Sequence, residues 1–338
     1  MRQALALFAL VLSISGNASQ LFEDDAVLHV KLSGPLTTMI KNKKNRVEYP
    51  FTLTVGENVI DLQVRVRGHS RLVVCHFPPL RLNFPEGSAA DTVLAGQGRV
   101  KLVTHCKNDS VRAENNVLDE YLVYRLFNLI SNQSYRVRLL QLSYEDTDAR
   151  LKDLDRPYYG FLIESDKELA ARIGGQAAEV TGVRYSLLDE DQTALMSVFQ
   201  YLVGNTDWSL LTAYDEDICC HNVDLFDIDG RLLPVPYDFD FSGVVNAAYA
   251  EPNPNLPIKR VTQRRFRGYC KSSIDAVATA TRRVVAMQDQ ILAMAREVPA
   301  LKDDYVAGRI RFLGDFFEQA EDEAKLIHKF DRHCIGPS

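Results

Sequence analysis

Several common sequence signals are absent, and each absence excludes a class of protein. The sequence has no Gly-x-Gly-x-x-Gly loop, no Cys-x-x-Cys pair and no basic tail. The missing Cys-x-x-Cys spacing argues against a zinc module. A formal net charge of −6 without a basic tail argues against general nucleic-acid binding. Internal repeats and low-complexity segments are also absent, which argues against solenoids and disordered arrays.

The N-terminus has the pattern of an export signal. Arg2 precedes an apolar run over residues 4–14, which is too short to span a bilayer comfortably, and Ala18 lies at a plausible cleavage point. A buried N-terminal helix would be amphipathic, and this run is not. No later run approaches a membrane span. We therefore expect residues 1–18 to be a signal peptide and the remaining protein to be exported, to the periplasm or outside the cell.

The cysteine content fits an exported chain, because an even number of cysteines predicts disulfides there. Cys75 and Cys106 lie in neighbouring strand-like segments and could pair across a sheet. Cys219 and Cys220 are adjacent, so each is expected to pair elsewhere, with the remaining two cysteines as candidates. A zinc site is the alternative, since three histidines lie next to cysteines. The remaining cysteines are Cys270 and Cys334, and the histidines are His76, His105 and His221.

Apolar periodicity predicts strands first and mostly helices afterwards, which is an α+β arrangement. We expect two lobes joined by a hinge near Glu164: a β-rich N-lobe over 19–164 and a helical C-lobe over 165–338. The expected strands are 26–32, 49–55, 60–68, 78–84, 99–105, 135–145 and 158–164, with two more around Asn222 and Asp238. The expected helices are 111–130, 165–173, 189–203, 271–297 and 302–330.

The densest polar chemistry lies between Gly204 and Gly243. Asp207 follows an apolar helix, Asn222 begins a strand, and Asp238 and Asp240 end another. On a regular strand, residues two apart point to the same side, so we expect these last two carboxylates to converge. Unpaired carboxylates next to apolar strands are costly unless they bind a cation. Two carboxylates and an amide in this order suit phosphoryl transfer from a metal–nucleotide complex.

Some of these candidates also have a purely structural interpretation. Asp207 could cap a helix beside Trp208, and Asn222 could simply end a loop. Alternating strand arginines such as Arg65 and Arg67 more often form a solvated face. However, they lie close to the RGHSR segment and are secondary candidates, with Arg71, for a phosphate site.

The order of several motifs resembles the CotH-type kinases, which are atypical protein kinases. The similarity covers roughly residues 60–245, and the stretch GNTDW…HN…LLPVPYDFD also resembles HipA-type kinases. The motifs are RVRGHS, FPPLRLNF, RVKLVTH, YYGFLIES, NTDW, HNVDLF and VPYDFD. The resemblance implies a two-lobed, atypical protein-kinase-like fold that uses ATP with Mg or Mn and phosphorylates a Ser or Thr hydroxyl of a protein substrate.

The resemblance also implies a role for individual residues. Asp207 would accept or orient the proton of the substrate hydroxyl. Asn222 and Asp238 would hold the metal ion, with Asp240 as a second candidate. Glu164 would lie near the adenine.

A phosphate-binding cation and its partner are implied as well, and here the alternatives stay open. The cation would be Arg81 or Lys101, each on a predicted strand. Glu120, in the helix that follows, would form an ion pair with that cation, and Glu114 is its competitor.

The sequence also departs from ordinary kinases. A segment of sequence SLLTAYDEDICCH separates Asp207 from Asn222, where ordinary kinases have a short loop. It could select a substrate or act as a disulfide-tethered strut. Two other functions therefore remain: a catalytically inactive binding or structural protein of the same fold, and a metal-dependent phosphoesterase, which would need more His or carboxylate ligands.

Overall fold

The computed structural model describes residues 20–210, 219–269 and 274–335. The predicted signal peptide, Cys270 and most of the segment between Asp207 and Asn222 lie outside these residues. Of the helices in the described part, none has both the length and the apolar character needed to cross a membrane.

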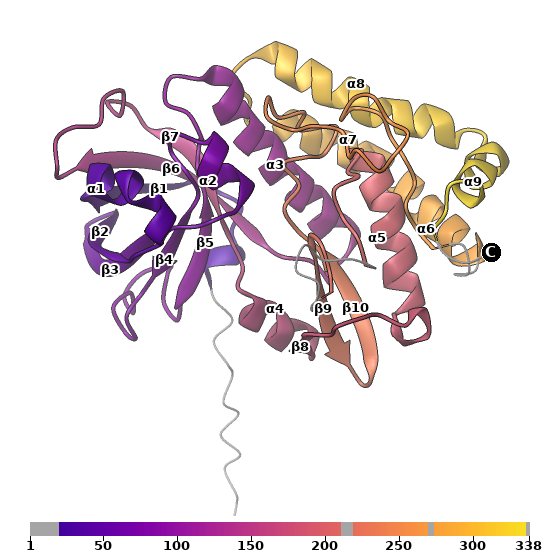
Figure 1. Cartoon of the computed structure of the whole chain (residues 1–338), viewed down its shortest axis with the longest axis horizontal. Coiled ribbons are helices and arrows are strands. Elements are labelled where there is room, and N and C mark those ends of the chain that lie inside the picture. The colour runs from indigo at the N-terminus through magenta and orange to yellow at the C-terminus, as the bar shows by residue number, and fades with distance from the viewer. Residues whose placement is uncertain (1–19, 211–218, 270–273, 336–338) are drawn as a thin grey trace, which may run out of the picture.

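Strands from the first half of the chain form a closed barrel (Figure 1). They run in the order β1-β2-β3-β4-β5-β7-β6, and a parallel pair, β6 with β1, closes the barrel between otherwise antiparallel neighbours. The strands are β1 (Leu28–Gly34), β2 (Tyr49–Val55), β3 (Asn58–Val66), β4 (Leu80–Asn83), β5 (Arg99–Val103), β6 (Val137–Asp146) and β7 (Tyr158–Ile163). All seven predicted strands are present, with ends shifted by no more than about two residues.

Helices and a small sheet make up most of the rest. The small sheet has the order β10-β9-β8, and a two-residue turn at Asp229-Gly230 joins its hairpin. The sheet strands are β8 (Gln176–Ala178), β9 (Val223–Ile228) and β10 (Arg231–Pro236). The helices are α1 (Leu36–Lys41), α2 (Ser70–Val74), α3 (Val111–Ile130), α4 (Asp166–Ile173), α5 (Glu190–Val203), α6 (Ile274–Ala286), α7 (Gln288–Glu297), α8 (Asp303–Ala320) and α9 (Glu323–Asp331); short 3₁₀ turns cover Gln20–Phe22, Lys43–Asn45 and Tyr185–Leu187.

The predicted mixed α+β class is confirmed. The helices predicted over 111–130, 165–173 and 189–203 match α3, α4 and α5 closely. The predictions over 271–297 and 302–330 were wrong in one respect, because each splits into two helices. The first break lies at Met287, where neither Gly nor Pro marks it, and the second lies at Asp322, whose side chain caps the next helix.

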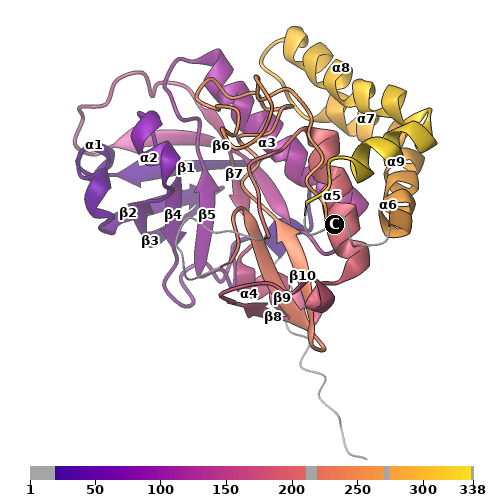
Figure 2. The same ribbon diagram turned by 45° about the vertical axis from the view of Figure 1, so that its right-hand side comes forward.

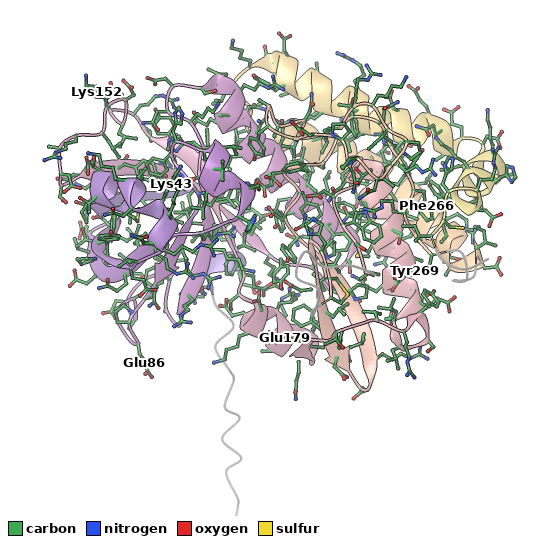
Figure 3. The ribbon with its side chains drawn as sticks, viewed as in Figure 1. Lys43, Glu86, Lys152, Glu179, Phe266 and Tyr269 are labelled. Carbon is green, nitrogen blue, oxygen red and sulfur yellow. A yellow bond between two sulfur atoms is a disulfide. The ribbon has the colours of Figure 1, made fainter. Side chains whose placement is uncertain are left out.

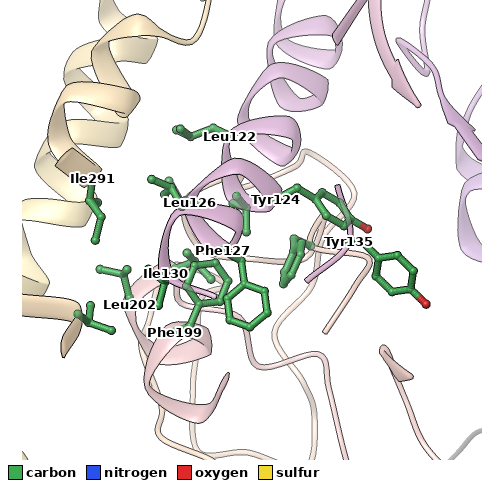
Figure 4. Packing of buried hydrophobic residues seen from close by; sticks show 14 of the residues in the cluster. Leu122, Tyr124, Leu126, Phe127, Ile130, Tyr135, Phe199, Leu202 and Ile291 are labelled. Carbon is green, nitrogen blue, oxygen red and sulfur yellow. The ribbon is translucent and has the colours of Figure 1, made fainter. Parts of the chain in front are cut away.

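Helix α3 lies between the barrel and the other helices in both views (Figures 1 and 2). Ser110 caps its first turn by accepting a hydrogen bond from Ala113 N. Leu126 lies on the side that faces Ile291 of α7, and Phe127 meets Phe199 of α5 with 4.6 Å between ring centroids (Figure 4). A helix buried on several sides in this way places its few polar residues inside the protein.

The hydrophobic core extends across Glu164. One cluster fills the barrel interior, and a larger one joins α3, the end of β7 and the C-terminal helices, so that Phe161 and Phe199 belong to the same cluster. The division into two lobes at Glu164 stays a prediction.

Gly160 of β7 lies where the neighbouring strands leave no room for a side chain. A Cβ atom there would lie 2.6 Å from a methyl group of Leu142 and 2.7 Å from the carbonyl oxygen of Val103. We expect Gly160→Ala to lower the free energy of unfolding by about 2 kcal/mol, because the backbone cannot move aside. Gly98→Ala is the control, since nothing lies within 4 Å of its Cβ position. Urea titration of both variants checks this, and equal stabilities would contradict it.

A buried ion pair between α3 and α8 predicts a dependence of stability on pH. Asp119 Oδ1 lies 3.1 Å from Arg309 Nε, and burial raises the pKa of Asp119 to about 7. The folded protein therefore holds a proton on this carboxyl between about pH 4 and pH 7, where the unfolded chain has lost it. The stabilisation is present below about pH 4 and is lost as the pH rises through about 7.

We expect Asp119→Asn to remove this part of the pH dependence. The free energy of unfolding of the wild-type protein, measured at about pH 5 and about pH 8, should fall more steeply than that of the variant. Parallel curves for the two proteins would show that Asp119 titrates normally.

Candidate functional site

Asp207 lies in a loop whose start requires glycine. Helix α5 ends at Gly204, which has φ +66°, and a Cβ atom there would lie 2.7 Å from the ring of Phe312. The chain then turns so that Asn205 Oδ1 accepts a hydrogen bond from Asp207 N at 2.9 Å. The predicted place of Asp207, just after an apolar helix, is confirmed.

Two neighbouring residues hold the carboxylate of Asp207. His221 Nε2 lies 3.0 Å from Oδ1, and Asn222 Nδ2 donates to Oδ2 at 3.0 Å and to the Asp207 carbonyl at 2.7 Å. The two residues thus stand beside Asp207 despite the long segment between them. His221 was considered in the sequence only as a zinc ligand.

Asn222 and Asp238 lie at the same end of the β9–β10 hairpin. Val223 pairs with Pro236, and Tyr237 N donates to Asn222 O at 3.1 Å. Both polar residues have left-handed backbones, with φ of 54° and 56°, which Asn and Asp tolerate better than most residues. Such conformations are enriched at functional sites.

Asp238 and Asp240 do not lie on a regular strand, so that expectation was wrong. Strand β10 ends at Pro236, and the backbone turns at Asp238. The two carboxylates still converge, but they do so on Arg71 at the start of α2.

Arg71 is buried and binds three carboxylates from distant parts of the chain. Its Nη2 lies 2.7 Å from Glu120 Oε2 and 3.3 Å from Asp238 Oδ1, and its Nε lies 2.8 Å from Asp240 Oδ2. Burial alone would lower the pKa of Arg71, but the charges of Asp240 and Glu120 raise it well above its usual value. Burial raises the pKa of Glu120 to about 7.

This network changes the expected partners. Glu120 pairs with Arg71 and not with Arg81 or Lys101. Asp240 is 3 % exposed and also accepts a hydrogen bond from Tyr249 Oη at 2.9 Å. Its carboxylate is therefore already bound by protein groups and is not available to a metal ion. The side chain of Asp238 is 47 % exposed, which leaves it accessible to a cation.

The competing candidate, Glu114, faces other groups. Its carboxylate binds Arg156 Nη2 and the backbone N–H of Tyr159, each at 2.9 Å. It therefore ties α3 to the start of β7.

A disulfide joins the segments that carry Arg71 and Glu120. Cys75 directly follows α2, Cys106 precedes α3, and the two are bonded as the sequence suggested. The cross-link restricts the unfolded chain and fixes α2 against α3.

The other expected disulfide pairing was wrong. Cys219 and Cys220 are bonded to each other instead of to partners elsewhere. Cys334 is also disulfide-bonded.

Three cations form a row across the outer face of the barrel. Arg65 of β3 lies directly opposite Arg81 of β4, which lies opposite Lys101 of β5. Like charges in directly opposite positions destabilise a sheet. Such a row is therefore retained at a cost to the ligand-free protein.

Arg81, at the centre of the row, has no ion pair among the described residues, although the charge of Asp166 partly opposes that of its neighbours. The pKa of Arg81 is lowered, first by burial and then by the charges of Arg65 and Arg67. Among the described residues, the Nε atoms of Arg67 and Arg81 are buried and have no hydrogen-bond partner. Burial also lowers the pKa of Arg67, and the largest charge that opposes this shift is that of Asp238. Arg67 therefore lies within the field of both the row and Asp238, and this group of cations favours an anion.

Lys101 is in a different situation from Arg81. Its Nζ lies 3.1 Å from Asp166 Oδ1 and 5.5 Å from the ring centroids of Tyr135 and Tyr237. Tyr135 Oη lies 3.0 Å from Asp166 Oδ1 and 2.5 Å from Asp224 Oδ2, and can donate its proton to either carboxylate. Burial raises the pKa of Asp224. Lys101 is thus already paired, and Arg81 is the cation that an anionic ligand would stabilise.

Glu164 is placed between β7 and α4. It is 3 % exposed, and its carboxylate binds the guanidinium of Arg172 and the backbone N–H of Arg136. The side chain therefore fixes the connection between these elements.

The remaining oxygen donors fit a hard divalent cation. Within the described residues, no three His, Cys, Asp or Glu side chains form a metal-binding group. However, Mg²⁺ is commonly held by one or two protein oxygens together with phosphate and water oxygens. Partial burial and the charge of Asp240 raise the pKa of Asp238, so a cation beside it would be favourable. The Oδ1 atom of Asn222 is a second donor.

Comparisons with known proteins give limited similarity. The proinflammatory kinase CtkA of Helicobacter pylori matches with 9 % identity over 75 % of this chain and 90 % of its own, at a TM-score of 0.39. A HipA–HipB toxin–antitoxin complex with operator DNA from Shewanella oneidensis MR-1 matches with 12 % identity over 70 % of this chain and 62 % of its own, at a TM-score of 0.34. No protein-family model and no curated protein matches. Similarity at this level assigns no residue a role.

Several residues of the site have little or no signal in the sequence. Arg71 was only a secondary candidate, because a buried arginine cannot be told from a solvated one by spacing. Tyr249 has no pattern at all. The adjacency of His221 to Asn222 was the one available signal for His221.

Arg71, which is paired with carboxylates, and Arg81, which has no ion pair in the described part of the chain, predict opposite effects of substitution on stability. We expect Arg71→Met to lower the free energy of unfolding by about 3 kcal/mol or more, because it leaves buried carboxylates unpaired. Arg81→Met should be neutral or slightly stabilising in the ligand-free protein, because it removes repulsion from Arg65 and Arg67. Urea denaturation of the oxidised variants measures both, and a strongly destabilised Arg81→Met would show that this cation has a structural partner.

Proposed function

We propose that the protein is a kinase-like phosphotransferase that moves a phosphoryl group from ATP, with Mg or Mn, to a Ser or Thr hydroxyl of a protein. The observation that carries this proposal is the pair of arginines, Arg67 and Arg81, whose buried Nε atoms have no hydrogen-bond partner among the described residues. A guanidinium whose Nε atom is buried and unpaired, such as that of Arg81, is costly, and a nucleotide polyphosphate would relieve that cost.

The roles follow from the contacts. Arg81 and Arg67 would bind phosphate oxygens, while Asp238 and Asn222 Oδ1 would hold the divalent cation, which neutralises charge on the phosphates when bound. Asp207, held beside Asn222, would accept the proton of the attacking hydroxyl. The Arg71–Glu120 pair replaces the lysine–glutamate pair of ordinary kinases as the link between α3 and the metal-binding aspartate.

The assignment to CotH-type kinases and export remain part of this proposal. Support for export comes from the disulfide-bonded cysteines, which are typical of oxidising compartments. The substrate, in this view, is another exported protein.

One observation favours the alternative of an inactive binding protein. Both carboxylate oxygens of Asp207 are already engaged, by His221 and Asn222. A substrate hydroxyl would have to displace or share one of these contacts. Nucleotide binding without transfer would support this alternative.

Nucleotide affinity tests the proposed roles separately. We expect Arg81→Met to weaken ATP binding about 10- to 100-fold with or without Mg²⁺, because it removes a charged hydrogen bond to phosphate. Asp238→Asn should weaken binding by a similar factor only when Mg²⁺ is present. Isothermal titration calorimetry with Mg²⁺ and with EDTA distinguishes the two patterns.

The matched control is Arg231→Met, which changes the net charge equally at the opposite end of β10, where Arg231 is exposed. We expect its ATP affinity to stay within about twofold of wild type. An equal loss of ATP affinity in Arg231→Met and Arg81→Met would show that only the net charge of the protein matters, and it would contradict the proposed phosphate site.

A further inference from the structure

Arg267 is hydrogen-bonded to the backbone on both sides of Asp207. Its Nη1 donates hydrogen bonds to the carbonyl oxygens of Thr206 and Trp208, the two neighbours of Asp207 in the chain. The guanidinium also lies 5.8 Å from the centroid of the Trp208 ring. One side chain from a distant part of the sequence thus fixes both peptide groups around the proposed proton acceptor.

The charge of Arg267 is compensated mainly by Asp207. Burial lowers the pKa of Arg267, and the charge of Asp207 is the one that opposes this shift. Within the described residues, Arg267 forms no ion pair, and its buried Nε has no hydrogen-bond partner. A partly buried cation with two carbonyl acceptors and a nearby carboxylate is favourable only while the loop keeps this geometry.

The neighbours of Arg267 are themselves fixed. Phe266 is 1 % exposed and stacks on Phe330, with 4.3 Å between ring centroids. Gly268 packs so closely that a Cβ atom would lie 3.1 Å from Ser197 of α5, and its carbonyl accepts a hydrogen bond from Ile335 N. Figure 3 shows Phe266 and Tyr269 on the helical side of the molecule, next to α5. The guanidinium is therefore attached to a rigid support.

We propose that Arg267 is a positioning residue for phosphoryl transfer, an inference that rests on the function proposed above. Asp207 has two sets of restraints: His221 and Asn222 hold its carboxylate, and Arg267 holds its backbone. In the transfer step, the acceptor O–H gives its proton to the Asp207 carboxylate, and the acceptor oxygen bonds to the γ-phosphorus. The bond from that phosphorus to the bridging oxygen breaks, and its electron pair leaves with ADP.

The variants are Arg267→Met and Arg267→Lys, with Arg264→Met as a matched control. Arg264 lies in the same segment and also donates to two backbone carbonyls, those of Leu202 and Phe312, but does not contact the residues next to Asp207. Transfer of the γ-phosphoryl group from radiolabelled ATP to dephosphorylated casein and to water gives kcat and KM. Hydrogen–deuterium exchange of the peptide covering 204–210 reports the loop directly.

We expect Arg267→Met to lower kcat about 100-fold while the KM for ATP stays within about twofold, because a displaced proton acceptor affects the chemical step and not nucleotide binding. Exchange at 204–210 should rise in Arg267→Met and stay at the wild-type level in Arg264→Met. Arg267→Lys should recover part of kcat. A merely structural role would change KM and kcat together.

Four results would overturn the inference. Wild-type kcat in Arg267→Met, or unchanged exchange at 204–210, would show that Arg267 does not position Asp207. An equal loss in Arg264→Met would make the effect one of general stability. A wild-type protein that binds ATP but transfers no label to casein or to water would contradict the proposed function, and with it the positioning role of Arg267.

Discussion

The buried guanidinium of Arg71 is the interaction on which the site depends. Arg71 lies in α2, and it binds Glu120 of α3 and both Asp238 and Asp240 of the turn after β10. It therefore joins these three parts of the chain. Removing it would leave carboxylates buried without a partner, which costs far more than a surface ion pair contributes. The Cys75–Cys106 disulfide fixes the same two helices covalently. Asp238 is therefore held in place by the fold before any ligand arrives.

The cations around Asp238 are of two kinds. Some form ion pairs within the protein, and others form none with any residue that the structure describes. Arg71 and Lys101 have carboxylate partners. Arg67 and Arg81 have buried Nε atoms without partners among the described residues. Proteins retain such repulsion between like charges where function requires it, and the cost is a lower stability of the folded state. The same logic applies to the left-handed backbone at Asn222 and Asp238.

The sequence predicted the elements well because their patterns are local. Alternating apolar residues located the seven barrel strands, and apolar residues at helical spacing located α3. Closure of the barrel through the parallel β1–β6 pair is a long-range contact that no local pattern carries. The order of Asp207, Asn222 and Asp238 gave the candidate site, but the partners of Glu120 and Asp240 depend on the burial of Arg71, which spacing does not reveal. The bond between Cys219 and Cys220 was missed because adjacent cysteines were assumed to pair elsewhere.

The central claim is that this arrangement is a metal–nucleotide site, and thermal unfolding of the oxidised protein tests it most directly. A ligand that binds only the folded protein must raise the midpoint by mass action. The account predicts a rise with ATP plus Mg²⁺ or Mn²⁺, a smaller rise with ATP in EDTA, and none with adenosine, which lacks the phosphates. An unchanged midpoint with ATP and either metal, at concentrations up to several millimolar, would contradict the account and leave the cations of the barrel face without a ligand.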